Sequence, residues 1–290
     1  MDEAHNITEL WTELPKVLSD WERIVYRTGQ NTDTDRKLLD VVASLRQKAR
    51  GGVEPPVELL DTAPFIHELR LFKSPAEVDM MRRAAEVTTE AHLECMLQTQ
   101  PEVNECEVDA LIEYTFRRRG CTGAAYTNIV AGGANACILH YVENDQTLAD
   151  GDLILIDAGS EWNYYATDVT RTFPVNGTFS PEQRAVYDVV LAAQKSVIEG
   201  LAPGVPFEWM HRHALEGIVD GLIDLGLLDG TRESVIEEKS YERFYMHKAG
   251  HWLGLDVHDC GAYFIDGTSR ALEAGMVLTV EPGIYISEDD

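Results

Sequence analysis

The sequence has few basic residues and no long apolar run. Its 290 residues include 24 Lys and Arg against 50 Asp and Glu, which gives a formal net charge of −26 at pH 7. A surface this negative repels phosphate backbones and anionic lipid headgroups, so we expect neither a nucleic-acid nor a membrane partner. No apolar segment approaches the roughly 20 residues of a membrane-spanning helix. The start, Met1-Asp-Glu-Ala-His-Asn6, lacks the basic residues and apolar stretch of a secretory signal.

Cysteine is scarce and scattered. No two of the five cysteines form a Cys-x-x-Cys pair, which argues against a disulfide framework and against a zinc–thiolate knuckle. We expect small, mostly buried thiols and a cytoplasmic protein. The five are Cys95, Cys106, Cys121, Cys137 and Cys260.

Two pieces of unequal size are predicted. Residues 1–70 offer one strand near Arg23–Tyr26 and two helices, and Gly51–Pro56 is typical of a loop or linker. Residues 71–290 are long enough for a full domain, and the 44% apolar content of the chain supports a packed core.

Helices and strands alternate in the larger piece without a regular βαβ order, which predicts an α+β fold. A capping box at Ser74–Glu77 begins one helix, and similar chemistry at Ser180 begins a helix that continues to Ile198. Further helices are predicted at Glu105–Arg118 and Glu208–Leu225. Strands are predicted at Leu153–Ile156, Asp168–Phe173 and Gly275–Val280.

Three histidines within twelve residues are the strongest chemical signal: His247, His251 and His258. Histidine is the commonest metal ligand among side chains. Acidic residues elsewhere complete a mixed set of imidazole and carboxylate donors, which suits a hard or borderline divalent ion. These acidic residues are Asp157, Asp168 and Glu281. The combination indicates a metalloenzyme.

Each candidate also has a structural interpretation. Asp157 and Asp168 could cap turns at strand ends, although a charged Asp157 after an apolar strand needs a partner or a metal ion. Glu281 before Pro-Gly is compatible with a turn, and His140 could be a buried, hydrogen-bonded histidine. The histidine run is not a His-Glu-x-x-His helix, because no glutamate lies between His247 and His251.

Six motifs occur in order and together resemble the bacterial Xaa-Pro aminopeptidases (aminopeptidase P), which are "pita-bread" metallopeptidases. The resemblance covers about residues 60–290. It implies a pita-bread (creatinase/aminopeptidase) fold over residues 71–290, preceded over residues 1–70 by a remnant of a smaller α/β N-terminal domain and a linker. The motifs begin at Phe72-Lys-Ser-Pro, Ile138-Leu-His-Tyr, Leu155-Ile-Asp-Ala-Gly, Thr167-Asp-Val-Thr-Arg, His251-Trp-Leu-Gly and Val280-Glu-Pro-Gly.

Transferred residue by residue, the resemblance implies roles for eight side chains. The ligands of a centre of two divalent ions, usually manganese, would be Asp157, Asp168, His251 and Glu281. Residues that hold the substrate and stabilise developing charge would be His140, His247 and His258, and Tyr285 would lie near the site. The implied reaction is attack on the amide carbon before proline by a hydroxide activated between the cations, with Glu281 also relaying a proton and imidazoles stabilising the oxyanion.

The resemblance also implies that the chain is truncated at both ends. The fifth ligand of the family is a glutamate in a Gly-x-Arg-x-Glu-Asp setting on a later strand, and Glu288 lacks that setting. We therefore expect the activity to belong to the complete protein, a homo-oligomer acting on peptides that begin Xaa-Pro, and the 290-residue chain alone to be inactive.

Three alternatives stay open. Prolidase, which splits Xaa-Pro dipeptides, shares the ligands, and so does methionine aminopeptidase, which generally lacks the N-terminal domain. Some pita-bread domains have lost their metal and bind peptides or histones without catalysis. A Glu-Asp on a strand after Asp290 would favour the peptidase, and a substitution there would favour the binding module.

Overall fold

The computed structural model describes residues 4, 6–19 and 21–287. The chain divides into two compact units, Met1–Glu68 and Leu69–Asp290. Within the described part of the chain, no helix combines the length and the apolar character needed to span a bilayer.

The first unit is built around a two-stranded parallel sheet. Strand β1 (Arg23–Val25) pairs with β2 (Glu58–Leu60). The predicted strand and two helices are confirmed, while β2 was not predicted. The helical elements are η1 (Ile7–Glu9), α1 (Leu10–Leu18), α2 (Thr32–Gln47), η2 (Ala49–Gly51) and the start of α3 (Ala63–Leu71).

Local capping chemistry sets the helix starts in the second unit. Helix α4 (Pro75–Gln98) begins after Ser74, whose hydroxyl accepts a hydrogen bond from the Glu77 N–H while the Glu77 carboxylate accepts one from the Ser74 N–H. Helix α5 (Glu105–Arg118) has a similar box at Asn104, and α6 (Pro181–Gly200) has one at Ser180. The predicted helices are confirmed here, including α7 (Phe207–Asp224). The shorter α8 (Arg232–Glu238) and η4 (Ser240–Arg243) were not predicted.

An antiparallel sheet positions the first acidic candidate. Strand β5 (Leu153–Asp157) lies between β4 (Ile129–Gly132) and β8 (Thr170–Pro174). Alternate residues of a strand face opposite sides. Ile154 and Ile156 are therefore fully buried against helices α4 and α5, and Asp157 faces the other side.

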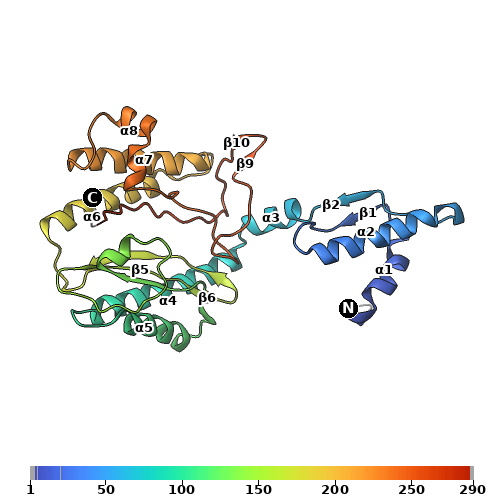
Figure 1. Cartoon of the computed structure of the whole chain (residues 1–290), viewed down its shortest axis with the longest axis horizontal. Helices are drawn as coiled ribbons and strands as arrows, with labels where there is room; N and C mark the ends of the chain where they lie inside the picture. The colour runs from blue at the N-terminus through green and yellow to red at the C-terminus, as the bar shows by residue number, and fades with distance from the viewer. Residues whose placement is uncertain (1–3, 5, 20, 288–290) are drawn as a thin grey trace. The chain divides into compact units, whose positions relative to one another are not determined.

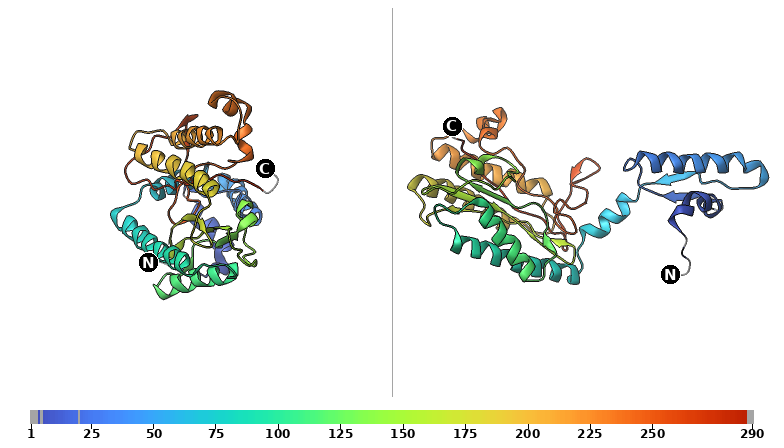
Figure 2. Two further views of the ribbon diagram at one scale, coloured as in Figure 1. Left: turned by 90° about the vertical axis from the view of Figure 1, so that its left-hand side faces the viewer. Right: turned by 60° about the horizontal axis from the view of Figure 1, so that its bottom comes forward.

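Helices cover both sides of this sheet. Figures 1 and 2 show α4 and α5 along one face, and α6 and α7 along the other. The remaining elements are a second antiparallel sheet, a short hairpin and a 3-10 turn: β3 (Gly123–Ala124), β6 (Ser160–Trp162), β7 (Tyr165–Ala166), β9 (Phe264–Ile265), β10 (Thr268–Ser269) and η3 (Gly133–Cys137).

Two strand predictions need correction. Strand β8 begins at Thr170 rather than Asp168, so Asp168 precedes the strand instead of opening it. In the sequence, β6 and β7 of the second sheet come between β5 and β8, although β5 and β8 pair directly. The strand predicted at Gly275–Val280 is wrong as a regular strand, because its pairing is limited to one isolated bridge, Trp252 to Leu278.

The segment before Glu281 is nevertheless extended and bonded to the histidine motif. Three backbone hydrogen bonds join them: Leu253 N–H to Val277 O (3.1 Å), Thr279 N–H to His251 O (2.9 Å) and Glu281 N–H to Ala249 O (2.9 Å). A Cβ on Gly250 would lie 2.1 Å from the Thr279 carbonyl oxygen, so the close approach of the two segments requires glycine there. This pairing brings His251 and Glu281 together.

Candidate metal centre

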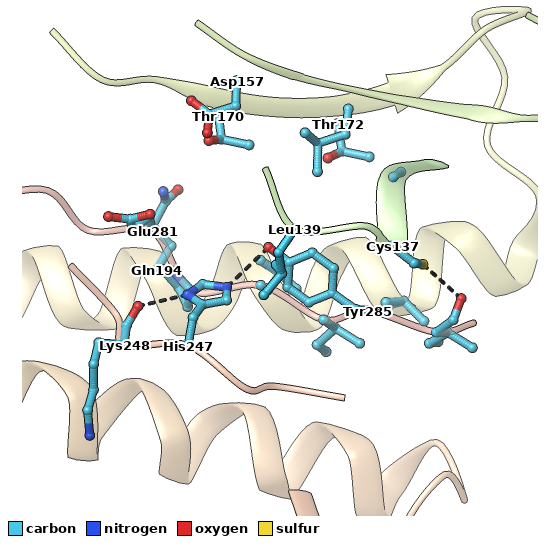
Figure 3. Close-up of a pocket in the computed structure, with 18 of the residues that line it drawn as sticks. Cys137, Leu139, Asp157, Thr170, Thr172, Gln194, His247, Lys248, Glu281 and Tyr285 are labelled. Carbon is cyan, nitrogen blue, oxygen red and sulfur yellow. Dashed lines mark hydrogen bonds between the residues drawn. The ribbon is translucent and has the colours of Figure 1, made fainter. Parts of the chain in front are cut away.

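A cleft of about 1800 Å³ lies on the face of the sheet that carries Asp157. Figure 3 shows Asp157, Thr170 and Thr172 pointing from their strands toward the side of the cleft that holds Glu281 and His247. All but one of the predicted site residues line this cleft: His140, Asp157, His247, His251, His258, Glu281 and Tyr285. The exception, Asp168, lines an adjoining cavity that also contains Glu281.

Three of the four predicted ligands meet at one point. The His251 Nε2 atom lies 3.1 Å from Asp168 Oδ2 and 3.1 Å from Glu281 Oε1. One ligand atom from each of these residues lies within 4.8 Å of those of the other two. Residues separated by more than 100 positions therefore form a site of metal-binding dimensions. Asp157 is not in this tight group.

The backbone fixes the orientation of the His251 ring. Its Nδ1 atom lies 2.9 Å from the Trp252 carbonyl oxygen, to which the Nδ1–H donates, and Nε2 is left facing the carboxylates. This second contact is typical of a metal-binding histidine. Burial lowers the pKa of His251, but hydrogen bonds to Asp168 and Glu281 outweigh burial and raise the pKa to about 10. In the absence of a metal ion, a protonated imidazole therefore balances the carboxylates.

Thr279 orients Glu281 and was not found by sequence reasoning. Its hydroxyl donates to Glu281 Oε1 (2.8 Å) and accepts a hydrogen bond from the His251 N–H (2.9 Å). Burial raises the pKa of Glu281, but the hydrogen bonds from His251 and Thr279 outweigh burial, so the net shift is downward. The sequence signal that could have identified Thr279 is its position two residues before Glu281, because residues two apart on an extended segment share a face.

Tyr126 joins Asp157 to the group and was also missed. Its hydroxyl lies 2.5 Å from Asp157 Oδ1 and 3.2 Å from Asp168 Oδ1. Burial, followed by the negative charge of Asp168, raises the pKa of Asp157 to about 7. Carboxylates held this close in a buried site favour either a shared proton or a cation between them.

The other histidines lie around this group. The ring of His258 is 4.3 Å from that of His251, at an angle of 71°. The His247 Nδ1–H donates to the Lys248 carbonyl (2.8 Å), and the Tyr285 hydroxyl oxygen lies within hydrogen-bonding distance of His247 Nε2 (3.1 Å), as Figure 3 shows. His140 is exposed on the cleft wall with a left-handed backbone, φ 59°. Glu288 lies outside the described residues.

The donor set fits a divalent metal ion. It combines one oriented imidazole nitrogen with carboxylate oxygens, a mixture suited to manganese, zinc or iron. The negative charges are buried enough to need compensation, and hydrogen bonds from Tyr126 and Thr279 orient the carboxylates. An α+β domain with such a centre in a cleft is typical of metal-dependent hydrolases.

Comparison with known proteins identifies the family of metal-dependent hydrolases to which the chain belongs. A model of metallopeptidase family M24 matches residues 79–290, and the chain belongs to this family. It is 45% identical over 289 residues to Xaa-Pro aminopeptidase of Haemophilus influenzae, an alignment that covers 100% of this chain and 64% of that protein.

Solved structures agree. The chain matches aminopeptidase PepP of Pseudomonas aeruginosa with a TM-score of 0.95 and 48% identity, covering 100% of this chain and 65% of that one. It matches a zinc-substituted Escherichia coli aminopeptidase P in complex with product with a TM-score of 0.93 and 40% identity, over 100% and 66% of the two chains. The predicted pita-bread fold and family are confirmed, and divalent-metal binding follows from the family and the cluster.

Proposed function

We propose that the full-length protein is a metal-dependent aminopeptidase that releases the first residue of peptides with proline in second position. The observation that carries this proposal is the convergence of Asp168, His251 and Glu281 beside a cleft that His140, His247 and His258 also line. The similarity to proteins named Xaa-Pro aminopeptidase supports the substrate class. The chain spans 64% of the length of the Haemophilus relative, so the activity is assigned to the full-length protein.

The metal ligands in this proposal are Asp157, Asp168, His251 and Glu281, and the metal is a pair of manganese ions. Such a pair, when bound, acidifies a water molecule and polarises the scissile carbonyl. Asp157 joins the set through Tyr126, whose hydroxyl lies within hydrogen-bonding distance of both aspartates. Release of the Asp157 proton to solvent would complete the ligand set, because its pKa of about 7 is close to neutrality.

The protein side chains divide the remaining work. Glu281 relays a proton during the reaction, and Thr279 keeps one of its oxygens in place. His140, His247 and His258 hold the substrate and stabilise the negative charge that develops on its carbonyl oxygen. The Lys248 carbonyl fixes Nδ1 of His247, so the ring presents Nε2 to Tyr285.

The proposal includes a cytoplasmic location and a homo-oligomeric full-length protein. None of the five cysteines forms a disulfide in the part of the chain that the structure describes, which supports a reducing compartment. The oligomeric state rests on the family resemblance alone.

A matched pair of peptides tests the substrate class. We expect the manganese-loaded full-length protein to release arginine from Arg-Pro-Pro at least about tenfold faster than from Arg-Ala-Pro, because a pocket shaped for proline discriminates by this order. Chelator should remove the activity and manganese should restore it. The measurement is the initial rate of arginine release, followed by chromatography.

Three other results would contradict the proposal, each in a different way. Equal rates on both peptides would reject the proline preference. Cleavage of Arg-Pro but not Arg-Pro-Pro would identify a prolidase. Tight binding of either peptide without cleavage, in protein shown to contain metal, would indicate a binding module.

A further inference from the structure

The loop between β4 and β5 carries His140, and the two residues before His140 give it little support, whereas Tyr141 after it is buried. Ile138 and Leu139, which precede His140, are 55% and 45% exposed. His140 itself is exposed and has a positive φ of 59°. Because the segment leading to His140 is exposed, the loop depends on its buried residues and on interactions at its base to hold one conformation.

Glu105 provides such an interaction at the base of the loop. It is the first residue of α5, and it is fully buried. Its carboxylate accepts four hydrogen bonds, and all four donors belong to residues 132–146: Gly132 N–H (2.7 Å), Asn135 Nδ2–H (3.1 Å), Tyr141 O–H (2.8 Å) and Gln146 N–H (3.0 Å).

The two carboxylate oxygens divide these donors by their place in the chain. Oε1 accepts from Gly132 and Asn135, which come before His140. Oε2 accepts from Tyr141 and Gln146, which come after it. One side chain therefore joins the outgoing and returning arms of the loop.

Hydrogen bonds and the helix compensate the buried charge. Among the ion pairs of the described residues, none involves Glu105. Its position at the start of α5 is favourable because the N-terminal end of a helix carries partial positive charge. The Glu105 N–H also donates to the Gln146 carbonyl (2.8 Å), which adds a backbone link to the returning arm.

We propose that Glu105 is a positioning residue that fixes the His140 loop against the start of α5 and so holds His140 in the cleft. The functional part of this inference rests on the proposed function, in which His140 contacts the substrate. Glu105 does not line the cleft, so it affects His140 only by holding the loop that carries it.

The isosteric change Glu105→Gln tests this inference. A glutamine amide keeps one acceptor oxygen and gains an NH2 group, which must face either Gly132 N–H or Gln146 N–H. Neither backbone group can become an acceptor, so one arm of the loop loses its backbone hydrogen bond to the residue 105 side chain whichever way the amide is oriented. Glu107→Gln is the matched control. Glu107 lies in the same first turn of α5, but its carboxylate accepts a hydrogen bond from the Asn104 N–H at the start of that helix.

Hydrogen exchange gives a readout that does not depend on activity. In the full-length protein, Glu105→Gln should accelerate amide exchange in residues 133–146 at least about tenfold relative to the parent, while Glu107→Gln leaves these rates unchanged. Unchanged exchange in folded Glu105→Gln protein would overturn the anchoring inference, even if the protein proves not to be a peptidase.

A double-mutant cycle with His140→Ala tests the functional part. Glu105→Gln should lower kcat on Arg-Pro-Pro by about 10- to 100-fold with unchanged metal content, because small displacements of catalytic groups cost this much. In the His140→Ala background it should add little, since the two changes affect the same contact. Additive losses would overturn positioning through His140.

Failure of the proposed function has a different signature. If His140→Ala alone leaves kcat unchanged, the assigned role of His140 fails, while the exchange result still decides the anchoring inference. If Glu105→Gln does not fold, Tyr141→Phe replaces it in both experiments, because it removes one donor from Oε2 and leaves the Gln146 N–H in place. Unchanged exchange and kcat in Tyr141→Phe would then overturn the inference.

Discussion

His251→Ala is expected to weaken metal binding by more than about 100-fold. Loss of a residue that only hydrogen-bonds to a metal ligand already lowers metal affinity by about 10- to 100-fold. His251 is itself a predicted ligand and supplies the only nitrogen among them, 3.1 Å from both Asp168 and Glu281. Activity should fall with the metal content. The measurement is manganese bound per chain after dialysis, together with the dissociation constant from calorimetry on the full-length protein.

His258→Ala is the matched comparison. Its ring lies 4.3 Å from that of His251 and lines the same cleft, but it is not a member of the metal-binding group. We expect kcat to fall at least about 10-fold, as for loss of an oxyanion-stabilising group, with metal content near that of the parent. Equal metal loss in both variants would show that the two histidines have been assigned the wrong roles.

Asp259→Asn is expected to lower the free energy of unfolding by about 3–5 kcal/mol, because it leaves buried positive charge without its partner. The side chains of Asp259 and Lys73 are each 1% exposed, and Lys73 Nζ lies 3.0 Å from Asp259 Oδ2. Arg70 bonds to the other oxygen of Asp259. The measurement is urea unfolding of the full-length protein, followed by circular dichroism.

Asp256→Asn provides the control for this prediction. Asp256 also pairs with Arg70, at 2.7 Å, but its side chain is 67% exposed. Exposed ion pairs contribute about 0–1 kcal/mol. A similar loss of stability in both variants would mean that burial of the Asp259 pair does not set its contribution.

The Asp259 pair also connects the stability of the domain to the site. The Asp259 N–H donates to the Trp252 carbonyl, the same oxygen that receives the Nδ1–H of His251. The sequence shows Lys73 and Asp259 only as members of separate motifs, 186 positions apart. Their contact could not be predicted from local patterns.

Elements with local signals were predicted well. Helices α4, α5 and α6 begin where a cap residue and its partner three positions later satisfy the free N–H groups of the first turn. Such chemistry depends on adjacent residues and can therefore be seen in the sequence. The strand character of Leu153–Asp157 followed from its apolar run, and its alternation placed Asp157 on the cleft face.

The features that the sequence did not predict depend on tertiary contacts. The segment before Glu281 has the composition of a strand, but its pairing with the His251 motif is limited to one bridge and alternating backbone bonds. Tyr126 reaches Asp157 and Asp168 across 31 and 42 positions from a loop with no motif of its own. The four ligands themselves were proposed from family motifs, since composition and spacing left turn-capping and core alternatives open.

The most direct test of the metal centre is anomalous diffraction at the manganese edge, from crystals of the full-length protein grown with manganese. We expect two peaks about 3.5–4 Å apart, one of them at His251 Nε2, with the carboxylates of Asp157, Asp168 and Glu281 among the groups that hold the pair. Peaks elsewhere, or a site in which Asp157 points away from the metal, would contradict the assignment of these four residues to one centre.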